Sequence, residues 1–160
     1  MRKLLITYYS KTNTTKEICE YMSQKLSESN NEITVLPIDQ VNELNTYDTV
    51  IIGGPINGMR WAEPVQKFTE NNAEILKNKQ VSLFYVSYLL DNGYKLWQKT
   101  IKKSLNKYKA LMNPIAIGEF YGRVEKSFTG VPKLLFGSSK DAPLDRRDWS
   151  KIDAFIEQVK

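Results

Sequence analysis

Four hydroxyl groups and one amide lie close together in the segment Ser10-Lys11-Thr12-Asn13-Thr14-Thr15. The segment stands directly before a helical pattern of apolar residues. Unpaired backbone N–H groups and the positive end of the helix dipole favour an anion at such a place, and hydroxyl groups add donors. The expected chemistry is phosphate binding. The alternative is that these side chains only cap the helix, a role that needs one such residue and not five.

A second segment combines glycine with groups that bind a flat ligand: Gly53-Gly54-Pro55-Ile56-Asn57-Gly58-Met59-Arg60-Trp61. Glycine lets the backbone approach a ring closely, and either Ile56 or Trp61 would cover a ring face. We therefore expect this segment to line a ligand site. The alternative is a tight strand-to-helix turn in which Trp61 packs on the surface.

The residue types that are missing exclude several kinds of chemistry. The chain has no histidine and one cysteine, Cys19. Histidine-dependent catalytic triads, HExxH zinc sites and internal disulfides are therefore excluded, and no metal site is expected. The P-loop and GxGxxG motifs are also absent. Carboxylate, hydroxyl and lysine groups remain for chemistry, and a bound organic cofactor is the favoured source of reactivity.

Short β-favouring runs alternate with helical apolar patterns along the chain. Strands are expected near 3–9, 33–38, 49–52, 80–88 and 113–122, and helices near 15–26, 65–76, 94–108 and 149–159. The third strand is expected to end at Gly53, and Asp148 or a neighbour to cap the last helix. This alternation predicts a parallel sheet with helices on both faces. Ligands bind such sheets at the carboxyl ends of the strands where the strand order reverses, which is where the two segments above are expected.

The 160 residues, with 41% hydrophobic and 26% charged residues, suit one domain spanning 1–160. The chain has no apolar run of the length needed to span a membrane, and its first residues do not resemble a signal peptide, so we expect a cytoplasmic protein.

Positive charge is concentrated in the second half of the chain. Residues 1–80 hold 9 basic and 10 acidic residues, whereas residues 81–160 hold 14 and 8. Six lysines surround the apolar stripe of the third helix, as either a solvated face or a docking patch for an acidic redox partner. Nucleic-acid binding is not expected, because the aromatic residues lie on the apolar stripe and not between the lysines.

The opening of the chain, LLITYYSKTNTTKEICEYMSQKL, resembles the flavodoxin family, whose phosphate loop reads [ST]-x-T-G-x-T. Ser10, Thr12 and Thr15 match this pattern and Thr14 adds a hydroxyl, but Asn13 stands where the family has glycine. Asparagine tolerates a left-handed backbone well, so the loop can still curl around a phosphate. The resemblance implies FMN as cofactor and a doubly wound, five-stranded parallel sheet of order 2-1-3-4-5 in a three-layer α/β/α sandwich.

The resemblance also assigns two further loops to the flavin site. The glycine-rich segment IIGGPINGMRWAEPV would flank the flavin ring, and Ser87-Tyr88-Leu89-Leu90-Asp91-Asn92-Gly93 would face its other side. Tyr88 is then a candidate for stacking, although a tyrosine at a strand end is often an ordinary rim residue. Arg60 beside the ring would stabilise a reduced flavin anion and favour two-electron chemistry.

Within this family, the layout is most similar to that of flavodoxin-like protoporphyrinogen oxidases, which pass electrons from an organic substrate to a membrane quinone. The likeness includes a basic, apolar insertion at about 123–145. This insertion would dock an anionic membrane or an acidic substrate, or simply fold back over the sheet. Two other functions stay open: a one-electron carrier that serves a reductase, and a flavin-free binding module on the same fold.

Overall fold

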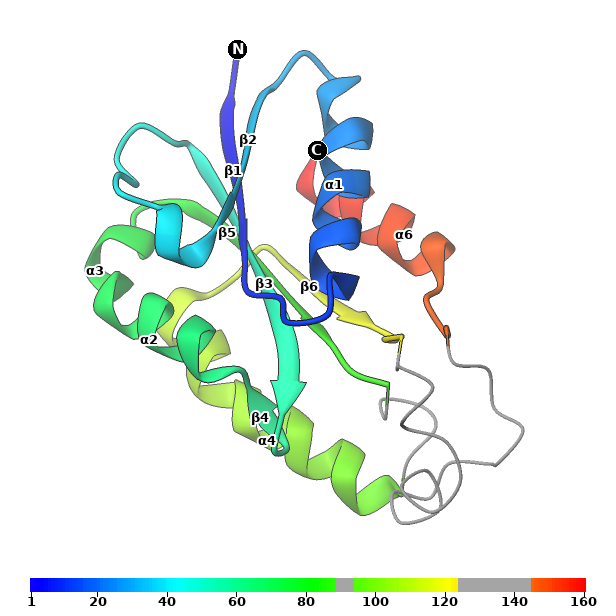
Figure 1. Ribbon diagram of the computed structural model, residues 1–160. Helices are drawn as coiled ribbons and strands as arrows, with labels where there is room; N and C mark the ends of the chain where they lie inside the picture. Colours follow the sequence, from blue (N-terminus) through cyan, green and yellow to red (C-terminus); the bar gives the residue numbers. More distant parts are fainter. Residues whose placement is uncertain (89–93, 124–144) are drawn as a thin grey trace.

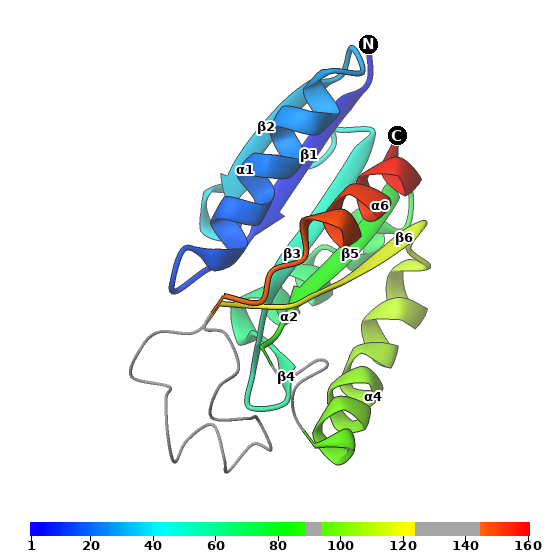
Figure 2. The same cartoon turned by 90° about the vertical axis from the view of Figure 1, so that its right-hand side faces the viewer.

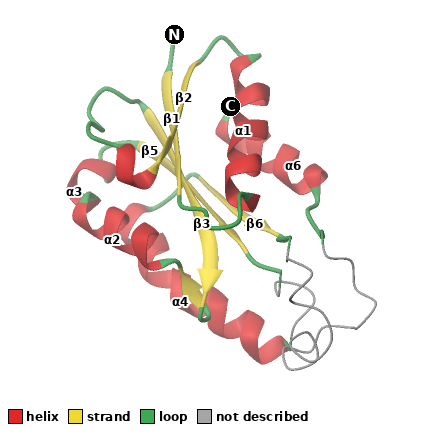
Figure 3. Cartoon of the chain, in the orientation of Figure 1, coloured by secondary structure: helices red, strands yellow, loops and turns green. Residues whose placement is uncertain are grey.

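The computed structural model describes residues 1–88, 94–123 and 145–160, and its centre is a parallel sheet between two layers of helices (Figure 1, Figure 3). The sheet order is β2-β1-β3-β5-β6. Its strands are β1 (Lys3–Tyr8), β2 (Glu32–Pro37), β3 (Thr49–Asn57), β5 (Gln80–Val86) and β6 (Ala116–Phe120). The expected flavodoxin-like, doubly wound sandwich is confirmed, with one addition: a two-residue strand, β4 (Arg60–Trp61), pairs antiparallel with the end of β3.

The helices divide between the two faces of the sheet. Figure 2 shows α1 (Thr14–Ser27) and α6 (Trp149–Val159) next to each other on one face. The other face is covered by α2 (Glu63–Asn71), α3 (Ala73–Leu76) and α4 (Lys95–Met112), while a short 3₁₀ helix, η1 (Ile38–Gln40), follows β2. None of the helices in the described residues is long and apolar enough to cross a membrane.

Two buried cores hold the layers together, because successive side chains of a strand point to opposite faces. Leu5, Val50 and Leu83 face α2 and α4, where they meet Val65 and Leu105. Their neighbours in the same strands face α1 and α6. This second core includes Leu4, Ile6, Ile51, Phe84, Ile18, Met22, Ile152, Phe155 and Ile156. Apolar burial on both faces explains why the inner strands read as nearly continuous apolar runs.

The expected end of the third strand at Gly53 is wrong, because β3 continues through Gly53 and Gly54 to Asn57. Gly53 pairs with Tyr8 on one side and Phe84 on the other. A Cβ atom at position 53 would lie 1.9 Å from Cζ of Phe84, and one at position 54 would lie 2.5 Å from Cγ2 of Val65. The two glycines therefore make room for core side chains and do not break the strand.

The expected helix over 65–76 is divided into α2 and α3 at Asn72. The Asn72 side chain donates a hydrogen bond to the Phe68 carbonyl oxygen at 2.8 Å, which competes with the continuing helical bonds. The expected cap of the last helix is confirmed. The Asp148 carboxylate accepts hydrogen bonds from the backbone N–H groups of Ser150 at 3.1 Å and Lys151 at 3.4 Å.

Replacing Gly53 with alanine tests the packing of β3 against Phe84. Because the new methyl group overlaps the buried ring, Gly53→Ala should lower the free energy of unfolding by about 1–3 kcal/mol in urea titrations. The second substitution Phe84→Leu should recover part of this loss by removing the overlap. An unchanged urea midpoint for Gly53→Ala would contradict the account.

Candidate functional site

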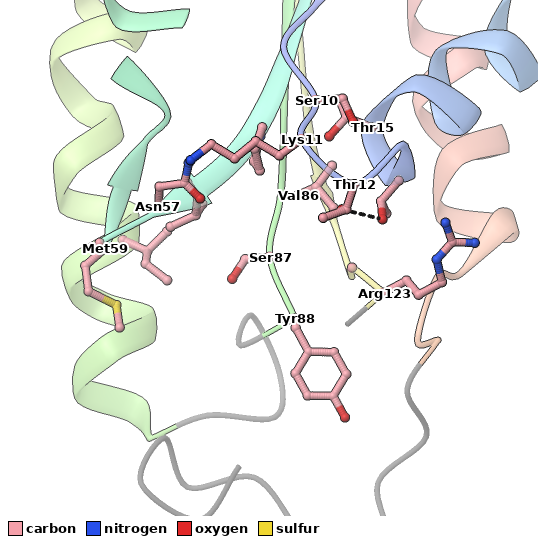
Figure 4. Close-up of a pocket in the computed structure, with 16 residues that line it drawn as sticks. Ser10, Lys11, Thr12, Thr15, Asn57, Met59, Val86, Ser87, Tyr88 and Arg123 are labelled. Carbon is pink, nitrogen blue, oxygen red and sulfur yellow. Dashed lines mark hydrogen bonds between the residues drawn. The ribbon is translucent and has the colours of Figure 1, made fainter. Parts of the chain in front are cut away.

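Three loops meet at the carboxyl ends of β1, β3 and β5, and line a cavity of about 420 Å³ (Figure 4). The strand order reverses between β1 and β3, which is where doubly wound sheets bind ligands. The volume falls within the range of about 300–1,000 Å³ that is typical of small-molecule sites. The described lining residues are Ser10, Lys11, Thr12, Thr14, Thr15, Pro55, Ile56, Asn57, Gly58, Met59, Val86, Ser87, Tyr88, Ile101, Gly122 and Arg123.

The loop after β1 places hydroxyl groups at the N-terminus of α1. Thr14 and Thr15 are the first residues of this helix and are buried, and Oγ1 of Thr12 lies 3.4 Å from Oγ1 of Thr14. Asn13 is the N-cap residue, with a left-handed backbone (φ 62°), as expected for the position where the family has glycine. Asn13 does not itself line the cavity.

Asn13 does not act as a side-chain cap, because its amide makes no capping hydrogen bond with the first turn of α1. The contrast with α6 is clear, since Asp148 accepts two bonds from the first turn of that helix. The capping interpretation therefore does not account for Asn13. The first-turn N–H groups and the nearby hydroxyls form a donor set suited to an anion.

The loop after β3 is a tight hairpin that the sequence analysis did not predict. Asn57 pairs with Arg60, and the two residues between them, Gly58 and Met59, both have positive φ values of 56° and 63°. This is the conformation of a type I′ turn, which suits the twist of antiparallel strands. A left-handed conformation is costly for methionine, and such strain is typical of ligand sites. Gly58, which lies between the apolar residues Ile56 and Trp61, was the feature of the sequence from which the hairpin could have been predicted.

Arg60 and Trp61 do not line the cavity, contrary to expectation. Trp61 is only 1% exposed, its Nε1 donates to the Gly54 carbonyl oxygen at 3.3 Å, and its ring meets that of Tyr108 at 5.4 Å between centroids. The indole thus belongs to the core under α4, so it neither covers a cavity ligand nor packs on the surface. Arg60 is exposed on β4.

The loop after β5 contributes Ser87 and Tyr88, both buried and both lining the cavity. The Ser87 backbone N–H donates to the Phe120 carbonyl oxygen at 3.0 Å, which fixes the start of this loop against β6. Figure 4 shows the Tyr88 ring at the opposite end of the cavity from Thr15. Stacking of Tyr88 on a ligand stays a prediction, and Gly93 lies outside the described residues.

The lining of the cavity includes two cationic side chains. Among the described residues that line it, Lys11 and Arg123 are cationic and none is acidic. Both terminal nitrogens of Arg123 contact the Glu17 carboxylate, at 3.2 and 3.0 Å, and Nη1 of Arg147 reaches the same carboxylate at 2.5 Å. Hydrogen bonds from Arg147 and Arg123 hold the pKa of Glu17 below its usual range, so this group is ionised at neutral pH.

Sequence reasoning missed four lining residues: Val86, Ile101, Gly122 and Arg123. Val86 and Ile101 follow the same apolar patterns as core residues, so the pattern alone does not separate them. Gly122 has a close neighbour, because a Cβ atom there would lie 3.2 Å from the Tyr88 backbone nitrogen. Arg123 was expected only as one cation of the insertion. Its place at the cavity depends on pairing with Asp145, which is distant in sequence.

The family model of the flavodoxin domain matches residues 5–129. The chain belongs to the flavodoxin-domain family. No curated protein matches the chain.

Solved structures share the fold of this flavodoxin domain at low sequence identity. A flavodoxin of Streptococcus pneumoniae TIGR4 is 15% identical with a TM-score of 0.65, and the match covers 98% of this chain and 97% of the other. Flavodoxin 2 of Bacillus cereus is 19% identical with a TM-score of 0.66, over 98% and 96%. Rubredoxin oxygen:oxidoreductase of Desulfovibrio gigas is 11% identical with a TM-score of 0.61, over 99% of this chain but 34% of the longer protein.

Membership of the flavodoxin-domain family implies that FMN is the cofactor, and the residues present fit this group. A phosphate monoester requires several hydrogen-bond donors and no nearby uncompensated negative charge. The N-terminus of α1 supplies backbone N–H groups together with Ser10, Thr12, Thr14 and Thr15. The apolar part of the lining, which includes Ile56, Met59 and Val86, suits a ring system.

Substitutions of Asn13 test whether its left-handed backbone shapes the phosphate loop. Asn13→Gly should change stability by no more than a few tenths of a kcal/mol, because glycine adopts this conformation freely. Asn13→Val should cost about 1–3 kcal/mol and weaken FMN binding, because a β-branched residue disfavours positive φ. Urea titration and flavin fluorescence would measure both effects. FMN affinity in Asn13→Val equal to that of the parent would contradict this role.

Proposed function

We propose that this flavodoxin domain is an FMN-dependent oxidoreductase that passes electrons from an organic substrate to an acceptor such as a quinone, in the manner of flavodoxin-like protoporphyrinogen oxidases. The observation that supports two-electron chemistry is the charge of the cavity. Lys11 lines it and no described lining residue is acidic, while the second lining cation, Arg123, is paired with Glu17. Positive charge favours a ligand that becomes more negative on reduction. Lys11 would thus take the role expected for Arg60, because the charge of Arg123 is paired with Glu17.

FMN, when bound, supplies the redox chemistry, and the chain supplies binding, orientation and electrostatics. The hydroxyl groups and the first turn of α1 would hold the phosphate. The apolar side chains of Ile56, Met59 and Val86 would shield a bound ring from water. Lys11 extends from the loop after β1 toward the loop after β3, so its charge lies along the cavity (Figure 4).

A second candidate function, a one-electron carrier for an acidic partner, is supported by the outer face of α4. This helix has six lysines and no acidic residue. Lys95, Lys99 and Lys103 recur at intervals of four, opposite the buried stripe that contains Ile101 and Leu105. Tyr94 and Leu96 are 55% and 65% exposed beside them. Exposed apolar groups among cations suit a docking face for a negatively charged protein.

Only part of the charge on α4 is compensated within the described chain. Lys102 lies 3.4 Å from Glu119, and Lys107 lies 2.8 Å from Glu70. No ion pair with a described residue involves Lys95, Lys99 or Lys103. Residues 124–144 of the basic insertion lie outside the described residues, and its ends meet in an antiparallel bridge between Arg123 and Asp145. Contact of this insertion with a membrane or an acidic substrate stays a prediction.

Cofactor binding is tested by comparing FMN with riboflavin, which lacks the phosphate. The parent should bind FMN more tightly, and Thr12→Val combined with Thr15→Val should weaken FMN binding about tenfold or more while riboflavin binding changes little, because two donors to the phosphate are lost. Flavin fluorescence would measure both constants, with Thr100→Val on α4 as a control. A parent that binds neither flavin would favour the flavin-free module.

The choice between enzyme and carrier is tested by anaerobic reduction of the FMN-loaded protein. Protoporphyrinogen should reduce the flavin directly if the chain is an oxidoreductase of the proposed kind. Rapid reduction only by an acidic ferredoxin would favour the carrier. In that case the triple reversal Lys95→Glu, Lys99→Glu and Lys103→Glu should slow reduction at least tenfold at low ionic strength.

A control triple keeps the same net charge but places it elsewhere: Lys25→Glu, Lys77→Glu and Lys160→Glu. These lysines lie at the end of α1, just after α3 and after α6, away from the outer face of α4. The control should leave the rate with ferredoxin nearly unchanged. Equal slowing in both triples would indicate an effect of net charge alone and would count against docking on α4.

A further inference from the structure

Four charged side chains form a compact cluster beside the phosphate-binding end of the cavity. Glu17, in the first turn of α1, accepts hydrogen bonds from Arg123 and Arg147. Arg147 also donates from Nε to Oδ1 of Asp145 at 3.0 Å and from Nη2 to Oδ2 at 2.6 Å. The Arg147 side chain is only 10% exposed. Two positive and two negative charges balance within this cluster.

The position of Glu17 is unfavourable for binding a phosphate. Glu17 follows Thr14 by three residues, so the two side chains neighbour each other on the surface of α1. Its backbone N–H donates to the Asn13 carbonyl oxygen at 2.9 Å, which places the residue directly behind the phosphate loop. An uncompensated carboxylate there would repel a phosphate dianion.

We propose that Arg123 is a positioning residue for the cofactor, which acts by pairing with Glu17 and so removes the repulsion between that carboxylate and the FMN phosphate. The inference rests on the FMN site proposed above. Arg123 lines the cavity, and Figure 4 shows its guanidinium turned back toward α1. Both of its terminal nitrogens are engaged by Glu17, at 3.2 and 3.0 Å. This geometry favours action through the carboxylate over direct contact with the phosphate.

Arg147 and Asp145 hold the cluster from the side opposite Arg123. Arg147 orients Glu17 from the other side and is itself fixed by Asp145, whose pKa its guanidinium holds below the usual range. The Arg123 and Asp145 backbones form an antiparallel bridge, and the Arg146 backbone N–H donates to the Gly122 carbonyl oxygen at 3.2 Å. The cluster therefore ties the first turn of α1 to the base of the 123–145 insertion.

A double-mutant cycle with two ligands tests the proposal. Dissociation constants for FMN and riboflavin would be measured by flavin fluorescence for Arg123→Gln, Glu17→Gln and the double variant. Arg123→Gln should weaken FMN binding on the order of threefold to tenfold at low ionic strength and leave riboflavin binding unchanged. In the double variant FMN affinity should return to the parent value, because the repelling charge is gone.

Three other results would overturn the proposal, and each has a different meaning. Weak FMN binding that persists in the double variant would mean that Arg123 contacts the phosphate directly. Equal losses for FMN and riboflavin would mean a structural role. A parent that does not distinguish the two flavins would refute the phosphate site itself. Lys160→Gln, which breaks an exposed ion pair with Glu157 at the far end of α6, is the matched control and should change neither constant.

Discussion

The first turn of α1 carries backbone N–H groups that need an acceptor, and most features of the site follow from this requirement. The neighbouring residues add hydroxyl donors, and the Asn13 side chain makes no capping bond with the turn. At α6 the same requirement is met within the chain by Asp148. What distinguishes α1 is that Thr12, Thr14 and Thr15 at its N-terminus line the cavity, so this helix end faces the ligand site.

The sheet determines where that ligand lies. The chain passes from β1 to β2 on one side and returns to β3 on the other, so the loops after β1 and β3 separate at the edge where the strands end. Gly53 and Gly54 let β3 pack close to Phe84 and Val65 up to this edge. The hairpin through Met59 then forms one wall of the cavity, and Ile101 of α4 contributes to its lining.

Local sequence signals predicted most of the fold and the phosphate loop, because both depend on short-range patterns. Apolar periodicity separated strands from helices, and the run of hydroxyls identified the N-terminus of α1. The failures concern residues whose position depends on distant partners. The sequence places Trp61 beside glycines and so predicts a ligand-stacking residue. In the structure, a ring contact with Tyr108 and a hydrogen bond to the Gly54 carbonyl oxygen hold Trp61 in the core. Arg123 follows β6 and is held at the cavity by Glu17 and by a backbone bridge with Asp145, 22 residues later in sequence.

The central claim is that the N-terminus of α1 holds the FMN phosphate as a dianion. Phosphorus NMR of the FMN-loaded protein between pH 5 and 8 tests it most directly, because a free phosphate monoester titrates near a pKa of about 6. We expect a single bound resonance whose shift does not change over this range, since N–H donors and the helix dipole favour the dianion. A bound resonance that titrates like that of free FMN would contradict it.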